Sequence, residues 1–490
     1  MFVYGGFMWI MILGIAMLLL GYIFYSRLLE RIIKPFKEPT PAYSMEDDED
    51  YVPMSKWKNQ LIQLLNIAGT GPIFGALMGA KWGPIVFLWI IFGSILGGAV
   101  HDYMSGMMSV RNGGSSATSL ITKYLGKWTE YPVLILMIGL MIMVAATFAR
   151  SASDLLFHIT GIETMVWMVV IIIYFIASAM LPINKLIGRI YPVFGILLIV
   201  MALVVIAGLL VGGYAFPEMT LENLHPTGDG FYPDMFITVA CGAVSGFHAS
   251  QSPMVARCMK HENEGRMIFY GAMLIEAVIA MIWATAGLAF FGSTSALAAE
   301  LGSTGASGAV YDISISVAGH VGGVLAVIGV IVCPITTGDT ALRSARMMVQ
   351  DDRGFDTRDM KTTLIITMFL TALIVLLTML DFTMLWNYFS WLNQTLACVV
   401  LWTATIFILT LGKNRLYSLV TALPAMFMMM VSLTFIMSSS SQGFGLDIGI
   451  SLTIAAVITA VAIAFYVRAV RKDLGNISGS VRTESGDGKI

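Results

Sequence analysis

Long runs of apolar residues, separated by short polar segments, dominate the pattern along this chain of 490 residues. A helix needs about 20 apolar residues to cross the roughly 30 Å hydrocarbon core of a bilayer. Thirteen runs meet this length, and they predict membrane-spanning helices near 3–25, 60–80, 84–109, 131–150, 164–181, 190–213, 233–256, 268–292, 318–342, 362–380, 384–411, 416–437 and 447–467. The pattern therefore predicts an all-helical, polytopic membrane protein.

The composition excludes the main soluble classes of protein. Hydrophobic residues make up 57% of the chain and charged residues 12%, against about 45–50% and about 25% in soluble globular proteins. So few charges cannot cover a water-exposed surface, and so much apolar sequence excludes a disordered chain. We expect the lipid bilayer as a partner and no nucleic acid. The sequence shows neither a nucleotide-binding motif nor a catalytic cluster of His, Asp and Glu, so we predict no enzyme and no cofactor.

The distribution of basic residues predicts how the helices are oriented. Alternate loops hold all but two of the 28 Lys and Arg residues, and the exceptions are Lys81 and Arg150. Cytoplasmic loops of membrane proteins carry such an excess of positive charge. We therefore expect the N-terminus outside and the C-terminus in the cytoplasm, and the regular alternation supports the count of thirteen spans.

Two of the predicted spans are interrupted by glycine and proline. The second span contains 66–72 (NIAGTGP), and the seventh contains 241–248 (CGAVSGFH), followed by Pro253. Broken backbone at mid-membrane is tolerated only beside a cavity, although close packing through small residues would also explain either segment. The segments lie five spans apart, so the two helices cross the bilayer in opposite directions, as in the inverted repeats of secondary transporters.

These breaks divide the chain into two halves of inverted topology, each with five helices. The predicted boundaries are 1–59 for an N-terminal helix and cytoplasmic loop, 60–213 for the first repeat, 233–411 for the second repeat, 412–472 for two accessory helices and 473–490 for a disordered cytoplasmic tail. A pair of broken helices in corresponding positions of two repeats predicts the binding site of a transporter.

The broken segments belong to a longer series of motifs. These are 67–72 (IAGTGP), 98–103 (GAVHDY), 240–248 (ACGAVSGFH), 270–276 (YGAMLIE) and 339–346 (DTALRSAR) with 350–351 (QD). In this order, over about residues 57–352, they closely resemble the carbon starvation protein A (CstA) family. The last third of the chain resembles the family mainly in hydropathy.

The resemblance implies a carrier of the prokaryotic inner membrane, linked to nutrient starvation and to uptake of peptides or pyruvate, with proton coupling in the pyruvate carriers. It also implies a fold similar to the amino acid–polyamine–cation superfamily, which agrees with the two repeats. The chain departs from the family because it is shorter than the long members, which carry additional helices. Gln63 stands where many members have a histidine, and residues 249–253 (ASQSP) replace a Ser/Gly/Thr-rich stretch.

The predicted substrate site lies at the two breaks. Backbone amides at the start of a half-helix hold a carboxylate without a buried cation, which suits a peptide, an amino acid or pyruvate. His248 follows the second break, where its ring can bind a carboxylate or move a proton, although packing would also account for it. The candidate substrate-binding residues are Gly69, Thr70, Gly71, Ser245, Gly246, Phe247 and His248.

Ionisable residues inside spans are costly and are therefore candidates for coupling ion movement to transport. In the functional interpretation, Asp102 or Glu276 takes up a proton as the carrier faces outward. In the structural interpretation, Asp339 pairs with Arg343 one helical turn later, and His101 is a packing residue that points about 100° away from Asp102. The candidate proton-coupling residues are Asp102, Glu276, His101 and Asp339.

Sodium is the alternative coupling ion. The resembling fold often has a cation site between the first broken helix and the eighth helix of the core, here 318–342, where threonine hydroxyls and backbone carbonyls supply oxygen ligands. The competing interpretation is that these hydroxyls bond to carbonyls of their own helix. The candidate sodium site is formed by Ala68, Thr336, Thr337 and Thr340.

Together these patterns predict a secondary active transporter that imports peptides or pyruvate by cation symport, preferably with protons, and that is linked to the carbon starvation response. Two other functions stay open, namely a sodium-coupled amino acid carrier and a membrane-embedded nutrient or starvation sensor. A sensor would need a soluble signalling domain, and no loop is long enough to form one. A channel would need a polar stripe along a span, and none is evident.

Overall fold

The computed structural model describes residues 9–47, 50–180, 183–355 and 359–471. Within these ranges the regular structure is helical, apart from one isolated bridge between Met54 and Met259. The predicted tail 473–490 and the first residues of the span 3–25 lie outside them. In the first half the elements are α1 (Trp9–Leu20), η1 (Gly21–Tyr25), α2 (Ser26–Ile33), α3 (Pro41–Ser44), α4 (Lys56–Ile67), η2 (Gly71–Gly75), α5 (Ala76–Gly79), η3 (Ala80–Trp82), α6 (Val86–Leu88), η4 (Trp89–Gly98), α7 (Ala99–Arg111), α8 (Ala117–Leu125), η5 (Lys127–Thr129), α9 (Glu130–Thr160), α10 (Thr164–Ala179) and α11 (Ile183–Val211).

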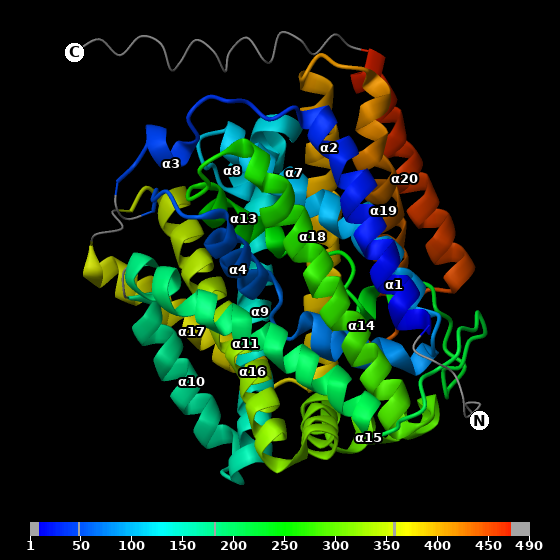
Figure 1. Cartoon of the computed structure of the whole chain (residues 1–490). Coiled ribbons are helices and arrows are strands. Elements are labelled where there is room, and N and C mark those ends of the chain that lie inside the picture. The colour runs from blue at the N-terminus through cyan, green and yellow to red at the C-terminus, as the bar shows by residue number, and fades with distance from the viewer. Residues whose placement is uncertain (1–8, 48–49, 181–182, 356–358, 472–490) are drawn as a thin grey trace.

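The second half is also helical from its first element to its last (Figure 1). Its long helix α16 is kinked at Gly319, where φ is +66°, a value that glycine adopts without strain. The elements are α12 (Asp234–Thr238), α13 (His248–Ala256), η6 (Glu262–Glu264), η7 (Arg266–Gly271), α14 (Ala272–Phe291), α15 (Thr294–Ser303), α16 (Gly305–Arg353), α17 (Met360–Thr378), α18 (Phe382–Thr410), η8 (Arg415–Ser418), α19 (Leu419–Ser438) and α20 (Ile448–Arg471).

Most of the predicted spans correspond to helices of sufficient length. Among the described residues ten helices are long and apolar enough to cross a membrane, and the bent pair Lys56–Ile67 and Gly71–Trp82 gives an eleventh. The predictions 164–181 and 233–256 fall on α10, with 16 residues, and on the short helices α12 and α13. The all-helical membrane fold is therefore confirmed, whereas the count of thirteen stays a prediction.

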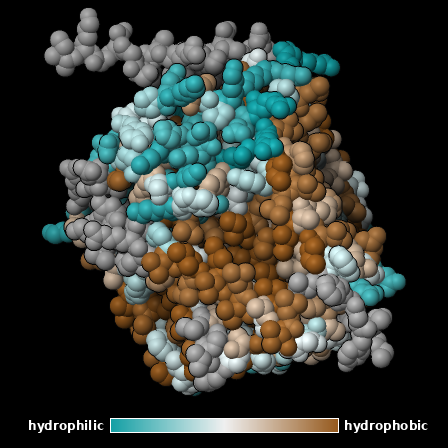
Figure 2. All heavy atoms as spheres, viewed as in Figure 1, coloured by the Kyte–Doolittle hydropathy of each residue, from teal (hydrophilic) through white to brown (hydrophobic). Residues whose placement is uncertain are grey.

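The helices differ in how far they are buried, and they form a central and a peripheral group. Figure 2 shows a broad hydrophobic band across the molecule, with a hydrophilic cap over the end that carries α2, α3 and α8. The segments Val86–Arg111 and Ala326–Gln350 are 83% buried in their most apolar part, but Ile448–Arg471 is only 17% buried. Helices that carry ionisable residues thus form the centre, and α20 presents apolar side chains at the periphery, where lipid would contact them.

The two broken helices cross in close contact. The chain bends by 57° between α4 and η2, and it leaves the helical conformation between α12 and α13. A Cβ atom on Gly71 would lie 2.1 Å from Cys241 Cβ, so only glycine allows this approach. The breaks predicted from the glycine-rich motifs are therefore present, and each break forms part of the packing surface of the other.

Candidate functional site

Two histidines flank the carboxylate of Asp102. His101 Nδ1 lies 2.8 Å from Asp102 Oδ1, and His248 Nδ1 lies 2.9 Å from Oδ2. His101 and Asp102 are neighbours in α7, whereas His248 is the first residue of α13, directly after the second break. The packing interpretation of His101 therefore omits its main contact, because its ring bonds to the adjacent carboxylate.

Glu276 of α14 extends this group to a fourth residue. Its Oε2 atom lies 3.6 Å from His248 Nε2, within ion-pair range but longer than a hydrogen bond. The row His101–Asp102–His248–Glu276, called the tetrad below, thus connects three helices that are distant in the sequence. All four residues stand out in the sequence as ionisable groups inside apolar spans, but no sequence pattern predicts that they form one group.

Small residues bring the three helices of the tetrad together. A Cβ atom on Gly98 would lie 2.2 Å from the carbonyl oxygen of Ala243, so η4 and the second break touch through backbone. Ser94 donates a hydrogen bond to the Gly242 carbonyl, and Tyr270 donates one to the Ile95 carbonyl. The motifs 98–103, 240–248 and 270–276 therefore pack together, and this packing positions the four side chains of the tetrad.

The tetrad is buried away from water, and only some of its polar atoms have hydrogen-bond partners. All four side chains are 0% exposed. His101 Nε2 and both carboxylate oxygens of Glu276 have no hydrogen-bond partner among the described residues. Burying two carboxylates is costly unless positive charge or protons accompany them. The proton-coupling role of these four residues stays a prediction.

The second break is supported by Asn393 of α18. The Phe247 amide donates to Asn393 Oδ1 at 2.7 Å, and the Gly246 amide donates to the Asn393 backbone oxygen at 3.1 Å. Ser245 Oγ also donates to Asn393 Oδ1. These amides are therefore paired within the protein, and the role of Ser245, Gly246 and Phe247 in binding a carboxylate stays a prediction.

The first break is less completely satisfied. The ring of Phe148 covers Gly69, where a Cβ atom would approach within 2.4 Å of the ring. The backbone oxygen of Thr70 accepts from Phe74, but its hydroxyl has no partner among the described residues. The same holds for both side-chain polar atoms of Gln63 and Asn66, which are buried in α4. Polar groups thus accumulate without partners on the half-helix that precedes Gly69 and Gly71.

The threonines of the candidate sodium site mostly bond to their own helix. Thr336 donates to the carbonyls of Val332 and Cys333, and Thr340 donates to those of Thr336 and Thr337. This confirms the competing interpretation for the two residues. Thr337 Oγ1 is buried without a hydrogen-bond partner among the described residues, and α16 contacts η2. A cation site with Ala68 stays a prediction.

Asp339 belongs to a different contact. Its Oδ2 atom accepts a hydrogen bond from Ser178 Oγ, at the end of α10, and Arg343 donates to the Ser178 backbone oxygen. Both charged residues therefore fasten α16 to α10. This arrangement favours the structural interpretation of Asp339, and its role in proton coupling stays a prediction.

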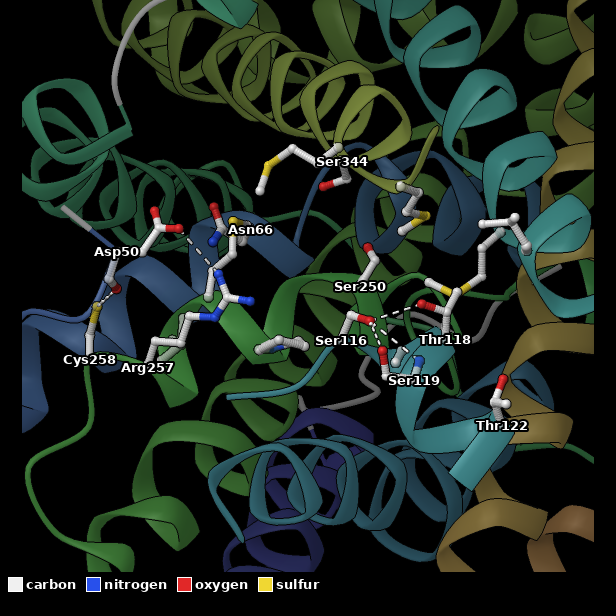
Figure 3. A pocket seen from close by; sticks show the side chains of 18 of the residues that line it. Asp50, Asn66, Ser116, Thr118, Ser119, Thr122, Ser250, Arg257, Cys258 and Ser344 are labelled. Atoms are coloured by element: carbon white, nitrogen blue, oxygen red, sulfur yellow. Dashed lines mark hydrogen bonds and ion pairs between the residues drawn. The ribbon is translucent and has the colours of Figure 1, made fainter. Parts of the chain in front are cut away.

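A cavity of about 540 Å³, called the vestibule below, lies beside the first break (Figure 3). Its walls come from α4, the start of α8, α9, α13 and the end of α16. Asn66, Ser116 and Ser250 line it, and the Asp50–Arg257 ion pair, with 3.3 Å between Oδ2 and Nη1, also faces it. The vestibule cannot be predicted from the sequence, because five separate segments form it. Asn393 cannot be predicted either, because a single Asn in an apolar run forms no pattern.

Comparison with known proteins gives one family. A family model described as carbon starvation protein CstA matches residues 6–165 and 151–321. An uncharacterized membrane protein of Haemophilus influenzae is 39% identical over 339 residues, which cover 58% of this chain and 91% of that protein. The peptide transporter CstA of Bacillus subtilis is 26% identical over 347 residues, covering 56% of this chain and 58% of the relative.

A second named relative is the pyruvate/proton symporter BtsT of Escherichia coli. It is 26% identical over 353 residues, which cover 56% of this chain and 48% of the relative. The chain thus spans about half the length of the named transporters that it matches.

Solved structures show the same fold at low identity. MhsT in complex with L-phenylalanine gives a TM-score of 0.55 at 14% identity and covers 85% of this chain and 99% of its own. A mutant of the Eremococcus coleocola manganese transporter gives 0.54 at 12% identity, with 89% and 99% covered. These likenesses confirm the helical fold. The family match covers the motifs from 67–72 to 270–276 and confirms their resemblance, whereas the motifs at 339–346 and 350–351 lie beyond the matched residues. The chain belongs to the carbon starvation protein CstA family.

Proposed function

We propose that this protein is a secondary active transporter that imports a small organic carboxylate, a peptide or pyruvate, together with protons. The observation that carries the proposal is the tetrad, in which His248 lies between the carboxylates of Asp102 and Glu276. Ionisable groups buried at the centre of a membrane fold are costly and are retained for function. Two carboxylates joined by imidazoles form a site that can accept, hold and pass on protons.

The position of His248 provides the link between proton and substrate. It is the first residue of the half-helix α13, so any tilt of α13 about the second break moves its ring relative to Asp102 in α7 and Glu276 in α14. A charged tetrad holds α13 against α7 through its ion pairs, and a change of protonation weakens or strengthens that hold. Protons would thereby bias the two orientations of a broken helix, as alternating access requires.

The named relatives support the proposed transport of carboxylates. Those named in the comparison include a peptide transporter and a pyruvate/proton symporter, and both substrate classes carry a carboxylate. We further propose a link to the carbon starvation response, in keeping with the family description, and a place in the bacterial inner membrane with the N-terminus outside. The repeats 60–213 and 233–411 would form the moving core, with 1–59 and 412–472 as accessory parts.

Sodium coupling is the second candidate, and one observation favours it. The hydroxyls of Thr70 and Thr337 are both buried without hydrogen-bond partners among the described residues. Thr70 directly precedes η2, and η2 is in contact with α16, which carries Thr337. Unsatisfied oxygen atoms of this kind suit a hard cation. In this version the tetrad would hold α7, α13 and α14 together, and Na⁺ at the first break would drive uptake.

Purified full-length protein in liposomes distinguishes the two. We expect an inward proton gradient without sodium to concentrate labelled pyruvate or a labelled dipeptide, and a protonophore to abolish the accumulation. Glu276→Gln should reduce proton-driven uptake by about a hundredfold, the lower range for loss of a proton-transfer group, yet leave exchange of labelled for unlabelled substrate intact.

The matched control is Asp154→Asn, which removes a carboxylate from a partly exposed pair with Arg150 in α9. It should transport normally. Full concentrative uptake by Glu276→Gln would overturn the proton role of the tetrad. Uptake that needs sodium and ignores the proton gradient would favour the second candidate.

A further inference from the structure

The vestibule has the features of a binding site that is separate from the tetrad. Asn66 lines it, is 1% exposed, and has no hydrogen-bond partner among the described residues for either its amide nitrogen or its oxygen. A buried carboxamide without hydrogen-bond partners is unfavourable in free energy. This polar group is available to a ligand, because it faces a cavity large enough to admit one.

The wall opposite Asn66 is rich in hydrogen-bond donors. Ser116 caps α8, and its hydroxyl bonds to the hydroxyls of Thr118 and Ser119 and to the Ser119 amide. Figure 3 shows these three side chains together with Thr122 on one side of the cavity and Asn66 on the other. The start of a helix carries partial positive charge, so this wall favours an anion.

The charged groups around the vestibule balance one another. Arg257 and Lys123 line it, as do the acidic residues Asp50 and Glu130. Asp50 is paired with Arg257, and Lys123 and Glu130 are both exposed, so the preference for an anion rests on Asn66 and the first turn of α8. The remaining lining includes methionines, among them Met137, Met254 and Met347, which adapt to apolar groups of varied shape.

We propose that the vestibule is a second substrate site, which binds the carboxylate of an organic acid between Asn66 and the first turn of α8 and its apolar body against the methionines. The proposal extends the proposed transport function, since the site lies directly before the first break and would hold substrate on its way to or from the centre. The volume, about 540 Å³, exceeds what a three-carbon acid fills and admits a dipeptide.

A native cysteine reports on occupancy. Cys258 lines the vestibule and is half-buried, whereas Cys241, Cys333 and Cys398 are buried. Burial raises the pKa of the Cys258 thiol, so labelling with N-ethylmaleimide is best measured near pH 8.5, about the ordinary thiol pKa. We expect alanyl-phenylalanine or pyruvate to slow labelling of the purified full-length protein about tenfold at ten times its Kd.

Variants test whether the protection of Cys258 arises from a ligand in the vestibule. Asn66→Leu and Ser119→Ala should each lose most of the protection while unliganded protein labels at the normal rate. Asp102→Asn should keep the protection, because Asp102 belongs to the tetrad and does not line the vestibule. Protection in wild type without proton-driven uptake would keep this site and reject the proposed function.

The carboxylate itself is tested with the C-terminal amide of the same dipeptide, which should not protect. Equal protection by the amide would overturn the proposal. So would unchanged labelling with both acids at concentrations that saturate transport.

Discussion

The two broken helices leave their backbone and side-chain polar groups in different states. At the second break, the amides of Gly246 and Phe247 and the hydroxyl of Ser245 all bond to Asn393. At the first break, Asn66 and Thr70 have no side-chain partner among the described residues. The same sequence device, a glycine-rich interruption, therefore produces a braced segment in one half of the molecule and an unsatisfied one in the other.

This difference fits separate roles for the two breaks. A braced break keeps fixed geometry around the tetrad, whose contacts to Asp102 are about 3 Å long, as the proposed proton exchange requires. An unsatisfied break beside the vestibule can offer its polar groups to a ligand. Unsatisfied buried groups in native proteins call for an explanation of this kind.

The largest expected effect comes from adding one methyl group at each break. In Gly246→Ala the Cβ atom would lie 2.3 Å from the Ala397 nitrogen and 2.4 Å from the Asn393 oxygen, which are backbone atoms that cannot rotate away. We expect a loss of about 3 kcal/mol or more, at or above the usual range for overpacking, seen as a lower thermal midpoint in size-exclusion assays of the purified protein.

Gly69→Ala should cost less, because its Cβ atom meets the ring of Phe148, a side chain that can shift. Gly139→Ala is the control, since nothing lies within 4 Å of that Cβ atom. If Gly69→Ala were as damaging as Gly246→Ala, the two breaks would be equally rigid and the comparison would fail.

A smaller effect should separate Asn393 from Asn66. Removing the Asn393 side chain in Asn393→Ala leaves the Phe247 amide without its acceptor, at about 1–3 kcal/mol for this buried group, whereas the Ser245 hydroxyl keeps Cys241 Sγ as an acceptor. Asn66→Leu removes a side chain that already lacks partners, so the thermal midpoint should stay the same or rise. A lower midpoint for Asn66→Leu than for Asn393→Ala would show that the first break is the one under structural demand.

The smallest effect concerns the end of the first broken helix at Trp82. The ring of His225 lies 4.5 Å from that of Trp82, which ends η3. Burial, reinforced by the charge of Lys81, lowers the pKa of His225. The folded loop therefore resists protonation, and its stability should fall as the pH drops below about 6.5, the ordinary histidine pKa.

Hydrogen exchange of residues 214–233 at neutral and acidic pH measures this loosening. His225→Gln should make the exchange rate of the loop less sensitive to pH. An unchanged pH response in that variant would assign the effect to other groups.

Sequence alone predicted the fold class because apolar length is a local property. It predicted the breaks because glycine and proline mark them directly. It named every residue of the tetrad, since ionisable groups stand out in apolar helices, but their assembly depends on how three distant helices pack. The helical-wheel argument separated His101 from Asp102, yet a flexible imidazole reaches its neighbour at 2.8 Å. Asn393 and the vestibule depend on tertiary contacts that no short pattern contains.

The 3.6 Å separation between His248 and Glu276 has a consequence for the energy supply of the cell. A continuous row of hydrogen bonds through a membrane protein would let protons cross without substrate and would dissipate the proton-motive force. On the proposed function, the long contact interrupts the tetrad, because a proton passes between His248 and Glu276 only when the two side chains approach. In the absence of substrate, the protein can then remain in an energised membrane without dissipating the proton gradient.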